Sequence, residues 1–472
     1  MQYSLLLPEI ILAGLGLLLL ALDLTASSKR SLAVAGVIGT LATLVAVVSN
    51  FGVTATDIWS GTIRVDDFAQ YFKLIFTLIL GLVFLFSGEY LEKRDVKVGE
   101  FYILVTFATL GAFLMASSLE LITIYIGLEL LTISSYVLAG MLRQDPRSSE
   151  ASIKFFLMGA LTSGVILYGL SLLYGLTGST HLVEIARGLA GSTNTGLIMA
   201  AGVFVIAGFG FKIAAVPFHM WAPDTYEGAP TPVSAFLITA SEAAGFAALL
   251  RILLVGMAPA LPQWQTILAV IAFVTMTFGN VTAIVQTRTK RMLAYSAIAQ
   301  AGYVLVGIAV ATPESVSAML FYLLVYAFTT IGAFAVVIML SNHIPNEEIE
   351  DFKGLGQRAP AFALAMTFLL LSLIGIPPTG GFFGKLSLYR SAVDGGLVWL
   401  ALAMVLNSAI SVPYYFGIIR NMYLAEAGAT STALAARTGL KLALGIAVAA
   451  TLLLGVFPEP LVGFLRSIQV MP

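Results

Sequence analysis

The chain contains no cysteine in its 472 residues. That absence excludes disulfides, thiolate zinc sites and cysteine-ligated iron–sulfur clusters within this chain. Histidine is scarce as well, with only His181, His219 and His343 present, which argues against a haem-binding bundle. The formal net charge of −1 gives no sign of nucleic-acid binding. We therefore expect no metal or redox cofactor to be bound by this chain itself.

Apolar residues dominate what the chain does contain. Hydrophobic residues make up 59% of it and charged residues 10%, whereas a soluble domain has about 25% charged residues. Too little polar surface remains to face water, so lipid must be the solvent for most of the chain. The opening helix, Leu5–Leu22, lacks the basic start and cleavage site of a signal peptide, and we expect it to be retained as the first span.

The hydrophobic runs can be counted as membrane spans. A hydrocarbon core about 30 Å thick requires roughly 20 apolar residues per helix, and by that rule the chain has about fourteen spans. We therefore predict an all-α integral membrane protein without a separate soluble domain. The predicted spans are 3–22, 31–53, 69–90, 101–117, 120–141, 151–175, 194–217, 229–255, 264–285, 292–312, 315–341, 360–389, 395–424 and 438–458.

The charges of the connecting loops support this count. Most lysine and arginine residues outside the predicted spans lie in the loops that follow odd-numbered spans. Because basic loops stay on the cytoplasmic side of a membrane, we expect both termini to face the opposite side. The loops on that opposite side hold only Arg64, Arg187, Arg390 and Arg466.

A few ionisable residues lie inside the predicted spans, where a charge at the bilayer centre costs about 2.5–3.5 kcal/mol even on a lenient scale. Glu129 is near mid-span and either carries protons or makes a helix–helix hydrogen bond in its protonated form. Lys212 precedes Pro217 by five residues. The proline leaves the carbonyl of Ile213 without its helical partner, so the helix should break directly after the lysine. Irregular backbone at that depth needs protein or water around it, which favours a functional lysine over one that snorkels to the surface.

A second lysine lies beside a second predicted break. Pro377 and Pro378 free the carbonyls of Leu373 and Ile374, and the glycines of the segment GIPPTGGFFGK allow a sharp bend. Lys385 ends this segment. The two breaks are separated by an odd number of spans, so they point in opposite directions across the membrane. Paired broken helices of opposite orientation are typical of an inverted repeat with its function at the breaks.

This pattern predicts the organisation of the chain. We expect two inverted five-helix repeats, spans 4–8 in residues 101–255 and spans 9–13 in residues 264–424, each containing a discontinuous helix. Residues 1–100 would supply the three N-terminal spans, and residues 425–472 the C-terminal one.

Other charges admit several interpretations. Lys154 starts the sixth span and could pair with Glu150, snorkel, or serve in a relay. Glu242 lies near mid-span and could pair with Arg251 or a lysine, and Lys73 is expected at the membrane interface. Desolvation favours the neutral form of both lysine and glutamate, so buried residues of the two types can act as proton stations. The predicted proton relay consists of Glu129, Lys154, Lys212, Glu242 and Lys385.

Several long segments resemble a known family. The chain is similar to the antiporter-like membrane subunits of proton-translocating NADH–quinone oxidoreductase (respiratory complex I) in KIAAVPFHMWAPDTYEGAPTPVSAFL, TKRMLAYSAIAQAGYVLVGI, YLLVYAFTTIGAFAVV and GIPPTGGFFGK. Among the three large related subunits it resembles subunit N, by LLPEIIL, DDFAQYFK, the early Lys154 and the lysine at 385. Subunit M is expected to have glutamate at that last position, and subunit L to continue into a long lateral helix.

The resemblance implies a role for each matching residue. Glu129 would be the glutamate of the first half-channel, paired with Lys154 or Lys212, and Lys212 the central lysine at the broken seventh helix. Lys385 would be the terminal lysine, which exchanges protons with the outer face or the next subunit. One residue departs from the family pattern S-K-A-A-G, because Glu242 replaces the lysine. We expect Glu242 still to carry protons, paired with Lys212 or Lys385.

The resemblance also implies a function, a translocase in which quinone reduction by NADH or a related donor drives proton transport. Gln300 stands where many bacterial members have histidine, which leaves the electron donor and quinone type open. NADH, FMN, iron–sulfur clusters and quinone are expected on partners, which would be homologous antiporter-like subunits and small membrane subunits. The membrane would be a bacterial plasma membrane or a thylakoid membrane.

Two other functions stay open from the sequence. The first is a subunit of a multisubunit Na⁺/H⁺ antiporter, which shares the lysine–glutamate pattern but uses an ion gradient. The second is a solute-carrying secondary transporter. That function would need a polar pocket at the breaks, where phenylalanine, glycine and alanine prevail.

Overall fold

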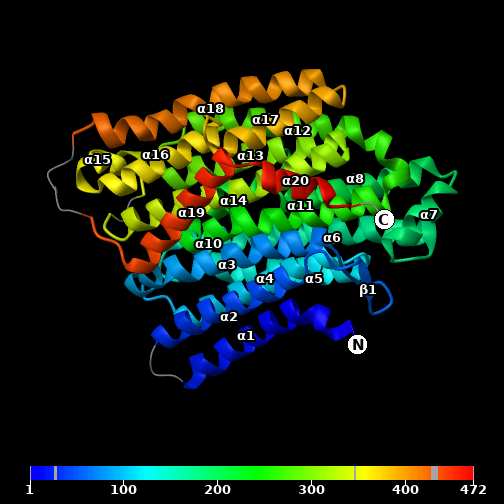
Figure 1. Cartoon of the computed structure of the whole chain (residues 1–472), viewed down its shortest axis with the longest axis horizontal. Helices are drawn as coiled ribbons and strands as arrows, with labels where there is room; N and C mark the ends of the chain where they lie inside the picture. The colour runs from blue at the N-terminus through cyan, green and yellow to red at the C-terminus, as the bar shows by residue number, and fades with distance from the viewer. Residues whose placement is uncertain (1, 26–28, 345–346, 427–433, 471–472) are drawn as a thin grey trace.

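The computed structural model describes residues 2–25, 29–344, 347–426 and 434–470. Long helices lie side by side with their axes roughly aligned, so that their connections gather at two opposite ends of the bundle (Figure 1). In the described residues, 13 helices are long and apolar enough to cross a membrane. The predicted all-α membrane architecture is therefore confirmed.

Up to Lys212, the described residues form seven long helices and two short ones. The long helices are α1 (Leu7–Thr25), α2 (Lys29–Ser49), α3 (Asp67–Lys93), α4 (Val98–Ser117), α5 (Leu121–Ala139), α6 (Pro146–Thr177) and α8 (Thr195–Lys212). The short ones are the 3₁₀ helix η1 (Gln2–Leu6) and α7 (Leu182–Ala190).

The next span is assembled from four consecutive pieces. After the short helix α9 (Trp221–Gly228) come α10 (Thr231–Phe236), the π-helical turn η2 (Leu237–Ser241), α11 (Glu242–Leu250) and a second π-helical turn, η3 (Arg251–Gly256). Together they make one continuous apolar span from Thr231 to Gly256. Every residue of this span is buried in the bundle.

The remaining helices complete the bundle. They are η4 (Ala258–Ala260), α12 (Leu261–Ile284), α13 (Thr289–Val310), α14 (Pro313–Ser341), η5 (Ile349–Phe352), α15 (Leu355–Arg358), α16 (Pro360–Ile374), α17 (Gly380–Asp394), α18 (Val398–Leu424), α19 (Thr438–Val456) and α20 (Glu459–Ser467). Helix α16 is too short to span alone. With α17 it makes up the predicted span at 360–389, in two pieces.

Local sequence signals fix several helix ends. Thr312 and Ser315 exchange side-chain and backbone hydrogen bonds in a capping box that starts α14. Asp145 caps α6 ahead of Pro146, and Gly178 ends that helix with a φ of 72°. Helices therefore begin and end where the loop residues dictate, close to the limits predicted from hydropathy.

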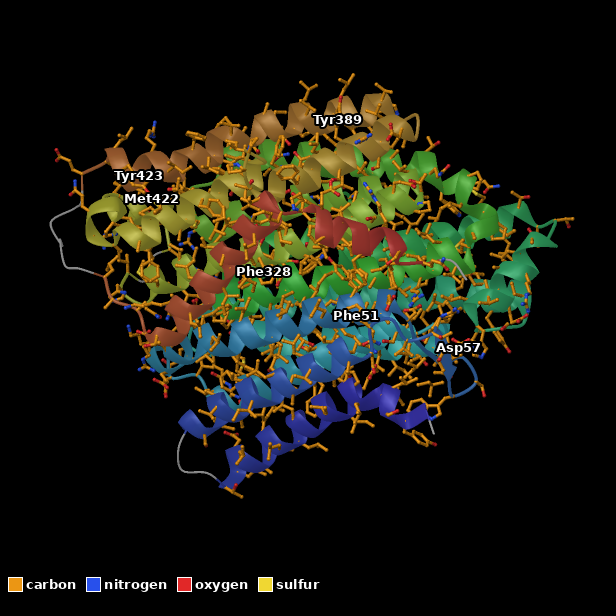
Figure 2. The ribbon with its side chains drawn as sticks, viewed as in Figure 1. Phe51, Asp57, Phe328, Tyr389, Met422 and Tyr423 are labelled. Atoms are coloured by element: carbon orange, nitrogen blue, oxygen red, sulfur yellow. The ribbon has the colours of Figure 1, made fainter. Side chains whose placement is uncertain are left out.

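One end of the bundle carries a small hairpin, and we call it the hairpin end. Its strands β1 (Thr56–Ile58) and β2 (Ile63–Val65) pair antiparallel in the connection between the second and third predicted spans. The N-terminus lies at this end (Figure 1), as does Asp57 (Figure 2). An isolated bridge joins Glu120 to His181 across two further connections of this end.

The opposite end, here called the basic end, holds the connections that carry Arg94, Arg143, Arg288 and Lys353. Arg94 donates to the carbonyl of Ser341 at 2.7 Å, which joins the end of α3 to the end of α14. Met422 and Tyr423 lie at the same end (Figure 2). The connections after odd-numbered spans thus meet on one side of the bundle, as the predicted alternation of spans requires.

Two charged residues have surroundings that the sequence did not predict. Lys73, expected at the membrane interface, is fully buried, because the side of α3 that carries it faces α1 and the Glu9 carboxylate 2.5 Å away. Arg251 pairs with Asp66 at 2.7 Å rather than with Glu242. Its guanidinium also lies over the ring of Phe68. Both pairs bind α3 to its neighbours within the membrane region.

Candidate functional site

The first predicted break lies where the sequence placed it. Helix α8 ends at Lys212, and Ala214 takes a left-handed conformation with a φ of 53° before α9 begins. The indole nitrogen of Trp221 donates to the carbonyl of Phe211 at 2.9 Å, which satisfies one of the backbone groups that the helix end leaves open. The break therefore presents Lys212 at the end of a helix inside the bundle.

Lys212 lies between two carboxylates of different helices. It is 4% exposed, and its ammonium donates to the hydroxyl of Thr132 on α5 at 3.1 Å. It also interacts electrostatically with Glu129 and with Glu242. Gly245 makes the room for its side chain, because a Cβ there would come within 3.0 Å of the Lys212 Cγ. The buried ammonium is thus held near carboxylates of two other helices, α5 and α11, with which it could exchange a proton.

Glu129, unlike Lys212, is only partly buried. It lies on α5 and accepts a hydrogen bond from the hydroxyl of Ser163 on α6. That hydroxyl is also 3.2 Å from the hydroxyl of Tyr125. Of the two lysines predicted as its partner, Lys212 is the one that interacts with Glu129.

Lys154 instead belongs to a charge network at the basic end. Its ammonium lies 2.7 Å from Glu150 and 2.7 Å from Asp224, and Asp224 is also bound by Arg291 at 2.8 Å. Burial by itself would raise the pKa of the Asp224 carboxyl, but the hydrogen bonds from Lys154 and Arg291 outweigh it and hold that pKa below its ordinary value. The predicted i,i+4 pair with Glu150 is confirmed.

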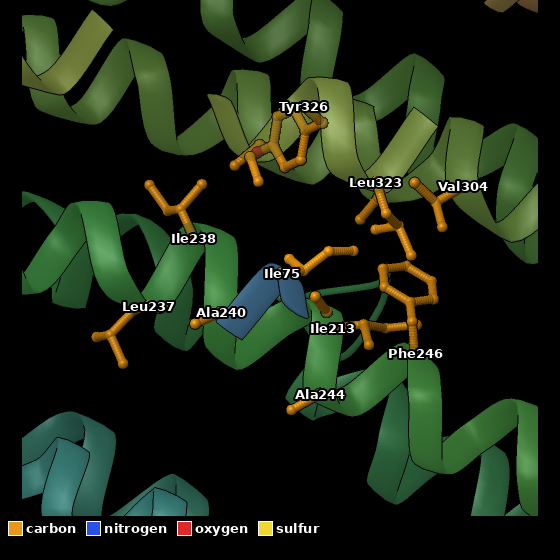
Figure 3. Packing of buried hydrophobic residues seen from close by; sticks show 14 of the residues in the cluster. Ile75, Ile213, Leu237, Ile238, Ala240, Ala244, Phe246, Val304, Leu323 and Tyr326 are labelled. Atoms are coloured by element: carbon orange, nitrogen blue, oxygen red, sulfur yellow. The ribbon is translucent and has the colours of Figure 1, made fainter. Parts of the chain in front are cut away.

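Glu242 is buried at the start of α11, next to the π-helical turn η2. It is 2% exposed and accepts a hydrogen bond of 2.8 Å from the hydroxyl of Tyr226 on α9. Its charge also influences Lys212 and, across the bundle, Tyr326 of α14. Glu242 therefore lies between the first broken helix and the second half of the bundle. Figure 3 shows the packing between these parts of the bundle, with Ile238 pointing towards the helix that carries Tyr326.

The second break also has the form that the prolines predict. Lys385, 7% exposed on α17, donates to the carbonyls of Leu373 and Ile374 at 2.8 and 3.2 Å. These are the carbonyls that Pro377 and Pro378 leave without helical partners. The lysine thus caps the end of α16 from the following helix, and its two shortest hydrogen bonds depend on the break.

The remaining surroundings of Lys385 are neutral. Its ammonium lies 4.2 Å from the centre of the Tyr303 ring and 3.4 Å from the Ser408 hydroxyl. No ion pair to Lys385 occurs among the residues that the structure describes. Carbonyl oxygens, a ring face and a hydroxyl stabilise an ammonium without fixing its charge by a counterion.

A row of hydroxyl and amide groups, which sequence reasoning missed, lies between Glu242 and Lys385. The hydroxyl of Tyr322 donates to the side-chain oxygen of Gln300, whose amide nitrogen donates to the Leu373 carbonyl at 3.3 Å. Lys385 donates to the same carbonyl. The Tyr322 ring stacks near that of Tyr326. The sequence offered one signal for this row: Tyr322 and Tyr326 in YLLVYAF are four residues apart and so lie on the same face of a helix.

No bound metal is implied by the donors of this region. In the described part of the chain, no group of three or more His, Cys, Asp or Glu side chains could hold a metal ion. What the arrangement offers is a set of ionisable and hydroxyl groups, spaced across the membrane region and shielded from lipid by the surrounding helices.

Comparison with known proteins defines the class of this chain. Residues 118–411 match the family model described as NADH:quinone oxidoreductase/Mrp antiporter, TM. The chain belongs to this family of antiporter-like membrane proteins. All five predicted relay residues lie within the matched segment.

Individual relatives narrow the class. The chain is 44% identical to the NADH-quinone oxidoreductase subunit N of Trichlorobacter lovleyi, over 98% of this chain and 96% of that protein. It is 40% identical to the F(420)H(2) dehydrogenase subunit N of Methanosarcina mazei, over 96% of each. A chain of Thermus thermophilus respiratory complex I has the same fold, with a TM-score of 0.83, 31% identity, and 98% of this chain and 100% of that chain covered. The predicted similarity to subunit N is confirmed.

Proposed function

We propose that this chain is a membrane-arm subunit that translocates protons in a complex that passes electrons from NADH or a related donor to quinone. The observation that carries the proposal is the pair of buried lysines, Lys212 and Lys385, each beside a broken helix and linked through Glu242 and the row of polar groups at Gln300. Buried ionisable groups in a membrane bundle mark an ion path. The relatives named after such oxidoreductases support the coupling to electron transfer.

In the proposed mechanism, protons pass along the membrane plane between stations. Lys212 exchanges a proton with Glu129 or Glu242, whose carboxylates compete for its charge. Beyond Glu242, Tyr326 and Tyr322 of α14 and Gln300 of α13 extend the path towards Lys385. Lys385 delivers the proton to the outer face or to the next subunit, since carbonyls hold its charge only loosely. Lys154 supplies charge near the basic end, where it is paired with Asp224.

The orientation and organisation follow from the same proposal. The basic end faces the cytoplasm, as the excess of lysine and arginine there favours, and both termini face the other side of a bacterial plasma membrane. Residues 101–255 and 264–424 act as two inverted halves, each with one broken helix. NADH, flavin, iron–sulfur clusters and quinone are bound by partner subunits.

The deciding experiment is purification of the tagged chain from its native membranes, followed by mass spectrometry. We expect co-purification of homologous antiporter-like subunits, small membrane subunits and peripheral iron–sulfur subunits. The alternative is a subunit of a multisubunit Na⁺/H⁺ antiporter, a possibility kept open because the family model includes such proteins. Co-purification of membrane subunits alone, with Na⁺-dependent proton exchange in the absence of an electron donor, would favour that alternative.

A further inference from the structure

A charged basin opens at the basic end, away from the relay residues. It has a volume of about 760 Å³, and its wall includes Arg94, Glu100 and Arg143. At its floor lie Lys290 and Glu347. Charges of both signs around a recess of this size hold water, so the basin brings solvent to the two floor residues.

The floor is an ion pair with further hydrogen bonds on both sides. Lys290 is 3% exposed, lies 3.5 Å from Glu347 and donates to the carbonyl of Ala229 at 2.6 Å. The other oxygen of Glu347 accepts from the hydroxyl of Thr231 at 2.9 Å. Thr231 is fully buried and does not line the basin. Glu347 therefore touches the basin on one side and the first residue of α10 on the other.

The backbone fixes Glu347 in this position. Its carbonyl accepts from the amide of Thr289 at 3.0 Å, and Ile349 donates to the carbonyl of Thr287 at 2.9 Å. Glu347 itself has a φ of 55°, a left-handed conformation that costs a non-glycine residue free energy. With its backbone held in this conformation, Glu347 places its carboxylate beside Thr231, the first residue of α10.

From Thr231 the polar contacts continue inward. One turn further along α10, the hydroxyl of Ser234 donates to the carbonyl of Tyr226 at 2.7 Å. The hydroxyl of Tyr226 in turn donates to Glu242. The first turn of α10 thus separates the basin and Glu347 from Tyr226, and water admitted there would have to bridge Thr231 to the Tyr226 hydroxyl, because Ser234 binds only the backbone carbonyl of Tyr226.

We propose that Glu347, paired with Lys290, is the proton-uptake site through which Glu242 is reached from the basin. In the closed state the ion pair covers Thr231. Protonation of Glu347 breaks its ion pair with Lys290, the carboxyl moves away from the floor, and water enters behind it as far as Thr231. Glu347 then gives up its proton through this water to the Tyr226 hydroxyl as Tyr226 passes its own proton to Glu242, and the deprotonated Glu347 pairs with Lys290 again. The delivery of the proton to Glu242 rests on the proposed function. The burial of Thr231 behind Glu347 does not depend on it.

The absence of cysteine makes the covered path measurable. Thr231→Cys is placed in the assembled complex, in membrane vesicles with the basic end outward, and a membrane-impermeant cationic methanethiosulfonate reagent is added. We expect slow labelling in this variant. Adding Glu347→Ala should accelerate it about tenfold or more, because opening no longer breaks a buried ion pair. The matched control is Glu350→Ala, an exposed residue of the same loop that pairs with Lys353, which should leave the rate unchanged.

Equal labelling rates with and without Glu347 would overturn the inference. If Thr231→Cys prevents assembly, Ser234→Cys, one turn deeper, serves in its place. A second arm measures donor-driven proton transport. Glu347→Gln should lower it severalfold while Glu350→Gln does not, and equal transport in both would also overturn the uptake role. Faster labelling without any proton transport in the unmodified complex would instead count against the proposed function.

Discussion

The two broken helices place their lysines in opposite kinds of surroundings. Lys212 at the end of α8 feels the charges of the Glu129 and Glu242 carboxylates, although it forms a close ion pair with neither. Lys385 on α17 is held by the carbonyls of Leu373 and Ile374 and by the face of a tyrosine ring. The same local pattern, a proline a few residues from a lysine, thus gives a lysine with charged surroundings in one half and a lysine with neutral surroundings in the other.

The difference teaches what a break in a membrane helix supplies. At α16 the break supplies its own acceptors, because the freed carbonyls satisfy the ammonium directly. At α8 the ammonium instead donates to the Thr132 hydroxyl of α5, and the nearby negative charges belong to Glu129 of α5 and Glu242 of α11. The stability of the Lys212 ammonium therefore depends on residues of other helices, whereas that of the Lys385 ammonium depends mainly on α16 and α17.

The largest expected effect follows from this dependence. Lys212→Met should reduce donor-driven proton transport to below about a tenth, as is usual when a proton-transfer group is lost. It should also lower the melting temperature of the complex, because two carboxylates lose their shared cation. Lys385→Met should reduce transport with a smaller loss of stability, since neutral groups remain behind. Transport assays in vesicles and thermal unfolding of the purified complex test both.

A double variant sharpens that result. Lys212→Met with Glu242→Gln should regain part of the melting temperature lost by Lys212→Met alone, while transport stays low. If the double variant is no more stable than the single one, Glu242 does not share the charge of Lys212.

The next effect concerns the residue that departs from the family pattern. Glu242→Gln keeps the shape and the hydrogen bond to Tyr226 but removes the titrating group. We expect severalfold fewer protons translocated per electron, with the complex assembled normally. Unchanged pumping per electron would show that Glu242 only influences the charge of Lys212. Glu242 would then carry no proton itself.

A steric change tests whether the position of Lys212 matters. Gly245→Ala would put a Cβ 2.8 Å from Ile213 and 3.0 Å from the Lys212 side chain. Overpacking of this kind costs about 1–3 kcal/mol, and the displaced lysine should lower transport a few-fold. The matched control is Gly164→Ala on α6, where a Cβ meets nothing within 4 Å. That control should leave transport unchanged and stability equal or slightly higher.

The smallest effect is expected in the neutral half. Tyr322→Phe removes the hydroxyl that binds Gln300 but leaves the carbonyl ligands of Lys385 in place. Transport should fall by about twofold to threefold, less than for a residue whose charge is lost. A loss as large as that from Glu242→Gln would mean that the neutral half is as dependent on its neighbours as the first half.

Sequence reasoning reached those features that are encoded locally. The position of the break at Lys212 and the identity of the two carbonyls beside Lys385 both follow from where proline removes a hydrogen bond. The alternation of spans follows from loop charges, and the pair of Lys154 with Glu150 from helical spacing. Each of these depends on residues within a few turns of one another.

Contacts between distant segments were beyond that reasoning. Nothing in the neighbourhood of Lys73 or Arg251 indicates that Glu9 and Asp66 would be their partners, since these pairs arise only once α3 packs against its neighbours. The polar row at Tyr322 and Gln300 was missed for the same reason. Tyrosine and glutamine in an apolar span give no sign of which helix they face.

The two π-helical turns in the eighth span have a consequence for how its residues are counted. A π turn holds one residue more than an α turn, and each residue of a helix advances about 100° around the axis. The span therefore changes phase at η2, just before Glu242, and again at η3, which begins at Arg251. A helical wheel drawn through the span with a constant period would put Glu242 and Arg251 on the wrong sides. The extra residue in η2 therefore sets the direction in which the Glu242 side chain leaves the helix towards Lys212.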